Sequence, residues 1–186
     1  MAKETVVGVG SGWQSEYDCQ VINMKRVWSP WRMKYVTKQL ETPGCLFCNV
    51  LQQSNDPENL IVHRGNHAYA ILNRYPYTSG HLMIVPNIHV SSLTDLDAPT
   101  RAELFDLLAH AEAALRQVYS PEGFNIGANL GEAAGAGIPG HLHFHIVPRW
   151  CGDTNFMSVV GETRVLPENL AETYRRIREA WLAPAI

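Results

Sequence analysis

The sequence contains no apolar run of about 18 residues, which excludes a conventional membrane-spanning helix. Its N-terminus lacks the charged-then-apolar layout of a signal peptide, so we expect a cytoplasmic protein with no membrane partner. Four cysteines in 186 residues do not indicate a disulfide framework. The net charge of -3 provides no basic excess, so we expect no general binding to nucleic acid.

The remaining composition is that of an ordinary globular protein. A chain of 186 residues with 46% hydrophobic content can form one domain with a sizeable core. Residues 1–23 show no clear hydrophobic period and are rich in small polar residues, which predicts a loosely ordered leader. The first patterned stretch begins at Met24, so we predict a single domain over residues 24–186.

Histidine alternates with apolar residues between Gly140 and Trp150. Alternation of period two predicts a half-buried strand with His141, His143 and His145 on one face and hydrocarbon on the other. At a rise of about 3.3 Å per residue, the outer two histidines are about 13 Å apart, so one metal ion cannot bind all three. At least one imidazole is then left for nucleophilic or acid–base chemistry, which suits a ring that is neutral near pH 7.

The rest of the chain predicts an α+β fold in which two amphipathic helices cover one side of a mostly antiparallel five-stranded sheet. A capping box formed by Thr100 and Glu103 begins the first helix. A turn with proline and glycine joins the second and third strands as a hairpin. The strands are expected at 60–64, 67–73, 80–85, 123–130 and 140–150, the helices at 99–119 and 167–181, and a short helical turn at 45–53.

The pattern His-apolar-His-apolar-His-apolar-apolar, from His141 to Val147, resembles the signature of the histidine-triad (HIT) superfamily of nucleotide hydrolases and transferases. The resemblance covers roughly Met24 to the C-terminus and implies the HIT-like fold, with two protomers joining their sheets into a homodimer. A segment rich in tryptophan and arginine, between Lys25 and Lys38, is similar to one in the branch that cleaves diadenosine tetraphosphate. It reads either as a solvated flank or as a lobe that helps to hold polyphosphate.

Cys45 and Cys48 form a Cys-x-x-Cys pair that is open to three interpretations: a redox couple, half of a zinc site, or two buried thiols. A redox pair normally follows a strand in a βαβ unit, and no such unit is seen here. Zinc needs two more ligands, for which His89 and His141 are available. The resemblance to zinc-bearing bacterial members implies that these four residues hold a structural zinc ion.

The resemblance also assigns roles to the other motif residues. It implies that His143 attacks the α-phosphate to form a nucleotidyl-histidine, while His145 contacts the phosphate oxygens or supplies a proton. His81 matches a histidine that supports the active site from the neighbouring strand, although it also reads as a packed core residue. Asn129 matches a polar residue near the scissile phosphate, and Asn73 matches the residue that hydrogen-bonds the ribose.

A glycine-rich loop leads from Gly131 to Gly140 directly into the histidine motif. Gly135 and Gly137 allow close backbone approach to a nucleotide, and N–H groups of the loop can form an anion-binding nest. Many family members carry Gln or Ser at the position of Gly137, so backbone N–H groups are the candidates for that contact here. One extra residue between Gly135 and His141 is shared with the diadenosine-tetraphosphate phosphorylase branch.

The sequence therefore predicts an enzyme of the HIT family, a nucleotidyltransferase or hydrolase that cleaves a phosphoanhydride bond. Its expected substrate is a dinucleoside polyphosphate, foremost diadenosine tetraphosphate, and its acceptor is inorganic phosphate or water. A mononucleotide is the other expected ligand. Three alternatives remain: a hydrolase of nucleoside 5′-phosphoramidates, a nucleotide-binding module without turnover, and a catalytic metal site that uses His141 and His143.

Overall fold

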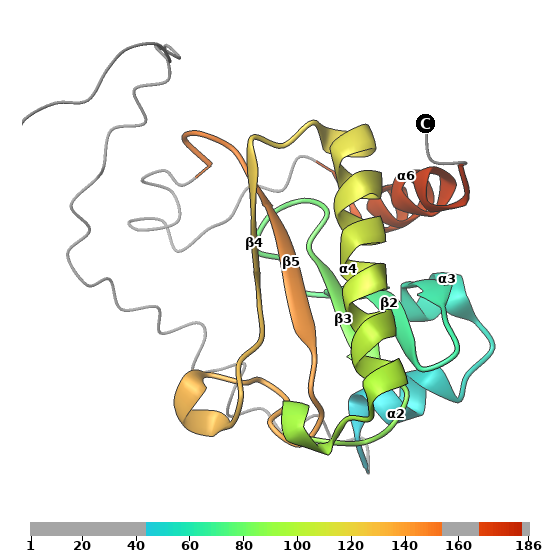
Figure 1. Ribbon diagram of the computed structural model, residues 1–186. Coiled ribbons are helices and arrows are strands. Elements are labelled where there is room, and N and C mark those ends of the chain that lie inside the picture. The colour runs from blue at the N-terminus through green and yellow to red at the C-terminus, as the bar shows by residue number, and fades with distance from the viewer. Residues whose placement is uncertain (1–43, 154–167, 184–186) are drawn as a thin grey trace, which may run out of the picture.

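The computed structural model describes residues 44–153 and 168–183 of the chain (Figure 1). The expected leader at residues 1–23 and the segment rich in tryptophan and arginine at residues 25–38 lie outside this described part. In the described part, no helix is long and apolar enough to cross a membrane.

In the part of the chain that the structure describes, five strands form one sheet in the order β1-β2-β3-β5-β4, and every neighbouring pair is antiparallel. This confirms the predicted α+β class. The hairpin predicted between the second and third strands is present, with Leu72 paired to Leu82 at its closed end. The strands span Ile61–Arg64 (β1), Ala68–Leu72 (β2), Leu82–Pro86 (β3), Gly123–Gly127 (β4) and Phe144–Arg149 (β5).

The long helix α4 packs along strands β2, β3 and β5, and α6 packs against α4 and β1 (Figure 1). Strands β2 and β3 lie in the middle of the sheet and are buried at every position. Their apolar side chains make up much of a single core that α4 and α6 complete. The helices span Leu46–Leu51 (α2), Asp56–Asn59 (α3), Ala98–Tyr119 (α4) and Leu170–Leu182 (α6).

The predicted capping box at the start of α4 is wrong. Asp97 is the N-cap, and its carboxylate accepts a hydrogen bond of 2.9 Å from the N–H of Thr100. Glu103 is instead used across the fold, where its two oxygens accept the peptide N–H groups of Asn66 and His67, each at 2.7 Å. A carboxylate that satisfies two N–H groups of a loop contributes more there than at a helix end already capped by aspartate.

The strand predicted at 140–150 begins later than expected. The structure starts β5 at Phe144, so His141 and His143 precede it. The hydrogen bonding between β5 and β3 does not extend to Leu142, because the peptide N–H of Leu142 donates to the carbonyl of Val90 at 2.6 Å. Val90 lies beyond the end of β3. Both faces are also covered here, since Leu142 and its two flanking histidines are all buried. The last helix likewise begins three residues late, because Asn169 caps it.

Gly80 is a position where only glycine fits, directly before His81. Its φ is +79°, and a Cβ there would lie 2.8 Å from the side chain of Leu115 and 2.9 Å from that of Tyr119. We therefore expect Gly80→Ala to lower the free energy of unfolding by about 2 kcal/mol or more, because it adds both strain and a clash. Urea denaturation measures this change.

Gly123→Ala is the matched control, because a Cβ at Gly123 meets no atom within 4 Å. Its free energy of unfolding should stay within about 0.5 kcal/mol of that of the wild type. Equal stability of the two variants would contradict the explanation given for Gly80.

Candidate functional site

The fold gathers four histidines at the junction of β3 and β5. His81 directly precedes β3, His141 and His143 directly precede β5, and His145 lies within β5 opposite Met83. The first three are almost fully buried, with exposed fractions of 0%, 1% and 5%. Phe144 contacts Phe105 of α4, so alternation along the strand turns His145 to the face away from that helix.

The ring of His143 is oriented by its own backbone. Its Nδ1 lies 2.8 Å from the carbonyl oxygen of His141. A carbonyl can only accept, so Nδ1 carries the proton and Nε2 keeps a lone pair. Burial lowers the pKa of His143, while the bond to the carbonyl raises it. A buried, neutral imidazole with a fixed tautomer has one nitrogen available as a nucleophile.

His81 and His145 form a pair whose tautomers are also determined. The peptide N–H of Tyr77 donates to Nδ1 of His81 at 3.2 Å, so the neutral ring of His81 carries its proton on Nε2. That nitrogen lies 2.9 Å from Nδ1 of His145 and donates to it. The proton of a neutral His145 is therefore on its own Nε2. His81 is thus buried, as in the core interpretation, and at the same time hydrogen-bonded to the histidine motif.

Asn73, the residue predicted to bind ribose, lies beside these two rings. Its Nδ2 lies 3.4 Å from Nδ1 of His81, and its Oδ1 accepts the N–H of Tyr75 at 2.9 Å. One donor and one acceptor of this amide are therefore engaged within the protein, which fixes its orientation.

The glycine-rich loop forms a separate part of the predicted site. The amide of Asn129 donates to the carbonyl of Gly135 at 3.5 Å, a weak contact that closes the loop. The N–H of Gly135 donates to the backbone carbonyl of Glu132 at 2.9 Å, so this N–H group is already used within the loop. Gly135 has a φ of +85°, and both Gly135 and Gly137 are exposed. Asn129 and Gly135 contact each other, and these hydrogen bonds stay within the loop and do not reach the histidines.

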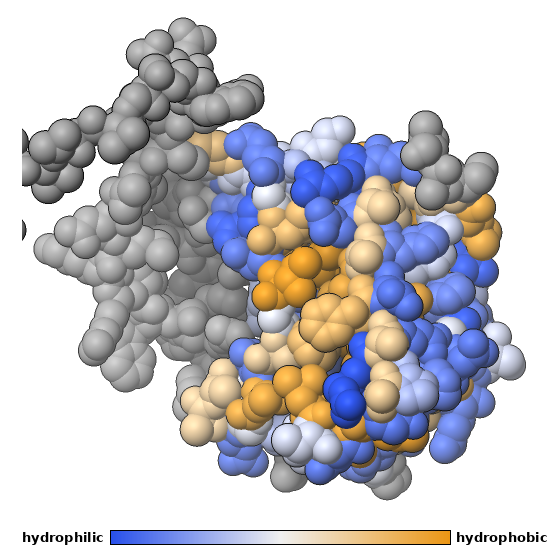
Figure 2. All heavy atoms as spheres, viewed as in Figure 1, coloured by the Kyte–Doolittle hydropathy of each residue, from blue (hydrophilic) through white to orange (hydrophobic). Residues whose placement is uncertain are grey.

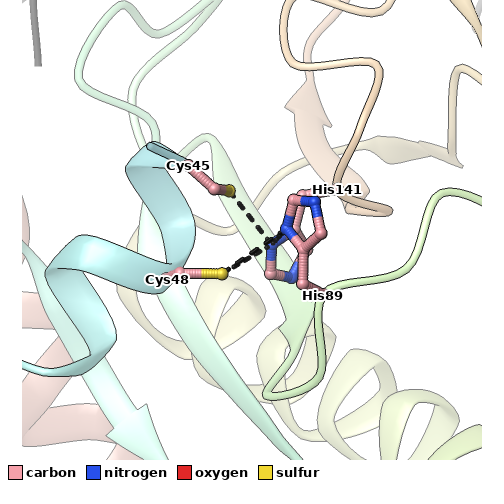
Figure 3. A group of neighbouring side chains, drawn as sticks. All are labelled: Cys45, Cys48, His89 and His141. Atoms are coloured by element: carbon pink, nitrogen blue, oxygen red, sulfur yellow. Dashed lines mark hydrogen bonds between the residues drawn. The ribbon is translucent and has the colours of Figure 1, made fainter. Parts of the chain in front are cut away.

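The four residues predicted to bind metal converge on one point (Figure 3). Cys45 and Cys48 extend from the first turn of α2 towards the imidazoles of His89 and His141. One donor atom from each residue lies within 4.8 Å of all the others. His89 follows β3 and His141 precedes β5, so three separate segments meet here.

The spacing of these donor atoms fits zinc. Tetrahedral bonds of about 2.0 Å to nitrogen and 2.3 Å to sulfur give edges of about 3.3 Å between nitrogens and about 3.5 Å between sulfur and nitrogen. The two Nδ1 atoms are 3.3 Å apart, and the sulfur–nitrogen distances are 3.2, 3.5 and 3.6 Å. Nε2 of His141 donates to the carbonyl of Pro86 at 2.9 Å, which leaves the lone pair of Nδ1 directed at the thiols.

The thiols also have the electrostatics of a cation site. Burial, a hydrogen bond that the thiol of Cys48 donates to Cys45, and the charge of Cys45 all raise the pKa of Cys48. Two sulfurs this close resist ionising together unless a cation lies between them. A zinc ion supplies that charge and deprotonates its thiol ligands.

Two aromatic residues of the site were missed from the sequence. Phe47 lies between the two cysteines, and its ring packs against His141 and His143 with centroids 5.4 and 5.0 Å apart. Tyr77 packs against His81 at 4.6 Å and is nearly parallel to His145 at 6.2 Å. The position of Phe47 inside Cys-x-x-Cys was a usable signal. No signal in the sequence pointed to Tyr77, because it lies in a turn whose path the sequence did not define.

Comparison with known families agrees with this geometry. The family model for the HIT domain matches residues 53–151, more than half of the chain. The chain belongs to the HIT family. An AP-4-A phosphorylase from Mycobacterium tuberculosis is 41% identical over 166 residues, which are 85% of each chain. A bis(5'-adenosyl)-triphosphatase from Saccharomyces cerevisiae is 32% identical over 91 residues, 48% of this chain and 44% of that protein.

A solved structure with the same fold carries zinc. It is a zinc-bound histidine triad family protein from Mycobacterium smegmatis, with a TM-score of 0.60 and 28% identity. The similarity covers 74% of this chain and 93% of that one. The family and the fold that the histidine motif predicted are therefore confirmed.

Proposed function

We propose that this HIT protein is an enzyme that cleaves dinucleoside polyphosphates, foremost diadenosine tetraphosphate, at the α-phosphate. The observation that carries the proposal is His143, a buried ring whose Nδ1–H is bonded to the carbonyl of His141 and whose Nε2 is kept as a lone pair. The 41% identity to a protein named AP-4-A phosphorylase supports the substrate. Relatives with that name and with the name bis(5'-adenosyl)-triphosphatase support cleavage of a phosphoanhydride bond.

In the first step, Nε2 of His143 attacks the α-phosphorus in line. The nitrogen–phosphorus bond forms as the bond to the bridging oxygen breaks, and the electron pair of that bond leaves with ATP. Nδ1 of His145 accepts a hydrogen bond from Nε2 of His81, so the proton of His145 is on its Nε2. His145 presents this Nε2–H to the phosphate oxygens, where negative charge develops. Splitting one displacement into two through a covalent intermediate lowers each barrier.

In the second step, an acceptor attacks the nucleotidyl-His143. Inorganic phosphate gives ADP, water gives AMP, and either one returns the histidine to its starting form. We propose phosphate as the acceptor, since the relative that matches 85% of this chain is named a phosphorylase. Asn73, beside His81, is our candidate for the ribose contact, and the N–H groups around Gly137 are our candidates for the contact with the bridging oxygen.

The test is incubation with diadenosine tetraphosphate, with and without phosphate, followed by chromatography of the products. We expect ATP and ADP when phosphate is present. We expect His143→Ala to lower kcat by roughly 10³-fold or more, as loss of a nucleophile does elsewhere. The exposed His67→Ala is the matched control and should keep wild-type kcat. AMP formed whether or not phosphate is present would make the protein a hydrolase, and no cleavage in either condition would refute the proposed function.

We propose that zinc occupies the Cys45–Cys48–His89–His141 cluster and that its role is structural. All four donors come from the protein, which is the composition of a closed site rather than of one with a position open to water. The cluster joins the first turn of α2 to the segment that precedes β5. Thiolate ligands persist in a reducing compartment, which supports the cytoplasm as the location.

Zinc removal separates a structural metal from a catalytic one. We expect one zinc per chain by elemental analysis, and a lower melting temperature after chelation, because the binding energy of the ion contributes to folding. Apoprotein that remains folded should retain part of its turnover. The exposed Cys151→Ser should keep its zinc, whereas Cys48→Ser should not. Complete loss of turnover in apoprotein with an unchanged circular dichroism spectrum would show a catalytic metal instead.

We also propose that two copies pair through strand β4. It lies at one edge of the sheet, and its residues 125–127 are exposed. Figure 2 shows apolar residues gathered over β4 and β5 beside α4. Phe105 is 63% exposed and Ile126 is 48% exposed, although both are large and apolar. Beside an apolar surface, a strand that pairs on one side only, among residues 44–153 and 168–183, supports the homodimer that the family resemblance implied.

Sedimentation velocity tests the dimer. We expect the wild type to sediment as a dimer and Ile126→Arg as a monomer, because a charge buried without a partner in the interface is costly. Leu182→Arg changes an apolar residue of α6 that is 66% exposed and should remain dimeric. A wild type that is monomeric at micromolar concentration would refute this assembly.

A further inference from the structure

The loop that joins β2 to β3 encloses one side of the His81–His145 pair. It is closed at its base, where the N–H of Asn73 donates to the carbonyl of His81 at 2.9 Å. The N–H of His81 in turn donates to the carbonyl of Thr78 at 3.3 Å. The loop therefore folds back on the histidine that follows it, and its middle residues are held close to the imidazole.

Tyr77 contacts the pair in two ways. Its peptide N–H, at 3.2 Å, is the shorter of two donors to Nδ1 of His81, and the amide of Asn73, at 3.4 Å, is the other. Its ring lies 4.6 Å from the ring of His81 and 6.2 Å from that of His145, at 38° and 27°. The backbone thus fixes the proton of His81, and the side chain limits the orientation of both imidazoles.

Thr78 anchors the same loop to the strand that carries His145. Its hydroxyl donates to the carbonyl of Pro148 at 2.9 Å. Pro148 lies in β5, three residues beyond His145, and belongs to the rigid ladder with β4. This bond therefore ties the part of the loop that positions the N–H of Tyr77 to the strand that carries His145.

We propose that Tyr77 and Thr78 form a clip that positions the His81–His145 pair, a role that rests on the proposed function. The N–H of Tyr77, the shorter of the two contacts to Nδ1, keeps the proton of His81 on Nε2 together with the amide of Asn73, and the bond from Thr78 to Pro148 holds that N–H in place. His81 can then donate to Nδ1 of His145, which places the proton of a neutral His145 on its Nε2. Tyr77 and Thr78 are positioning residues, because they act through the histidines.

The direct readout is long-range proton–nitrogen NMR of the full chain with 15N-labelled histidine at pH 8, which reports the nitrogen that carries each proton. Wild type, Tyr77→Phe and Thr78→Ser should each show single Nε2–H tautomers for His81 and His145. Tyr77→Leu and Thr78→Val should show a mixed tautomer for His81. Their kcat for diadenosine tetraphosphate should fall about tenfold, with KM within about twofold of the wild-type value, as expected for an effect on catalysis alone.

Tyr75→Leu is the matched control, since it removes an exposed tyrosine of the same loop and should change neither readout. The proposal is overturned if Thr78→Val keeps the wild-type tautomer, or if an altered tautomer leaves kcat unchanged. If Tyr77→Leu does not fold, the isosteric comparison of Thr78→Val with Thr78→Ser decides the matter. A wild type that cleaves no dinucleoside polyphosphate would refute the proposed function, while the tautomers would still test the clip.

Discussion

The site depends on hydrogen bonds that commit one nitrogen of each buried imidazole to the backbone. His81 accepts a peptide N–H, while His141 and His143 each donate to a carbonyl. A buried imidazole without such a partner would be costly and could also change its tautomer freely. Because one nitrogen is fixed, the other is available for the role that we propose for it, as metal ligand, nucleophile or donor. The same bonds that make burial tolerable therefore also determine the chemistry.

These backbone partners are available only because of the sheet order. Placing β5 between β3 and β4 brings Pro86, at the end of β3, beside His141, and brings His81, at the start of β3, beside His145. The antiparallel pairing of β3 with β5 sets these two contacts at opposite ends of one strand pair. The metal cluster and the His81–His145 pair are thus separated by the length of a strand, and His143 lies between them.

The sequence predicted most of this arrangement, because its strongest signals are local. Alternating histidines and the Cys-x-x-Cys pair identified the residues that converge, and the hydrophobic patterns located five strands and two helices. What it missed depends on contacts between distant segments. Glu103 matches a capping box locally, yet it binds two N–H groups of a loop that lie 36 and 37 residues away. The late start of β5 follows from the bond between Leu142 and Val90, which no local pattern encodes.

Phe47 connects the structural zinc site that we propose to His143, the nucleophile that we propose. The ring of Phe47 is 2% exposed and packs against both His141 and His143. The carbonyl of Phe47 accepts a hydrogen bond from the hydroxyl of Tyr69 in β2 at 3.0 Å. This bond attaches α2 to the sheet, in addition to the contacts that Cys45 and Cys48 make with the histidines. A turn of six residues is too short to be stable alone. Zinc bound as we propose would supply the missing stability, and the ring of Phe47 held in this way would restrict the imidazole of His143.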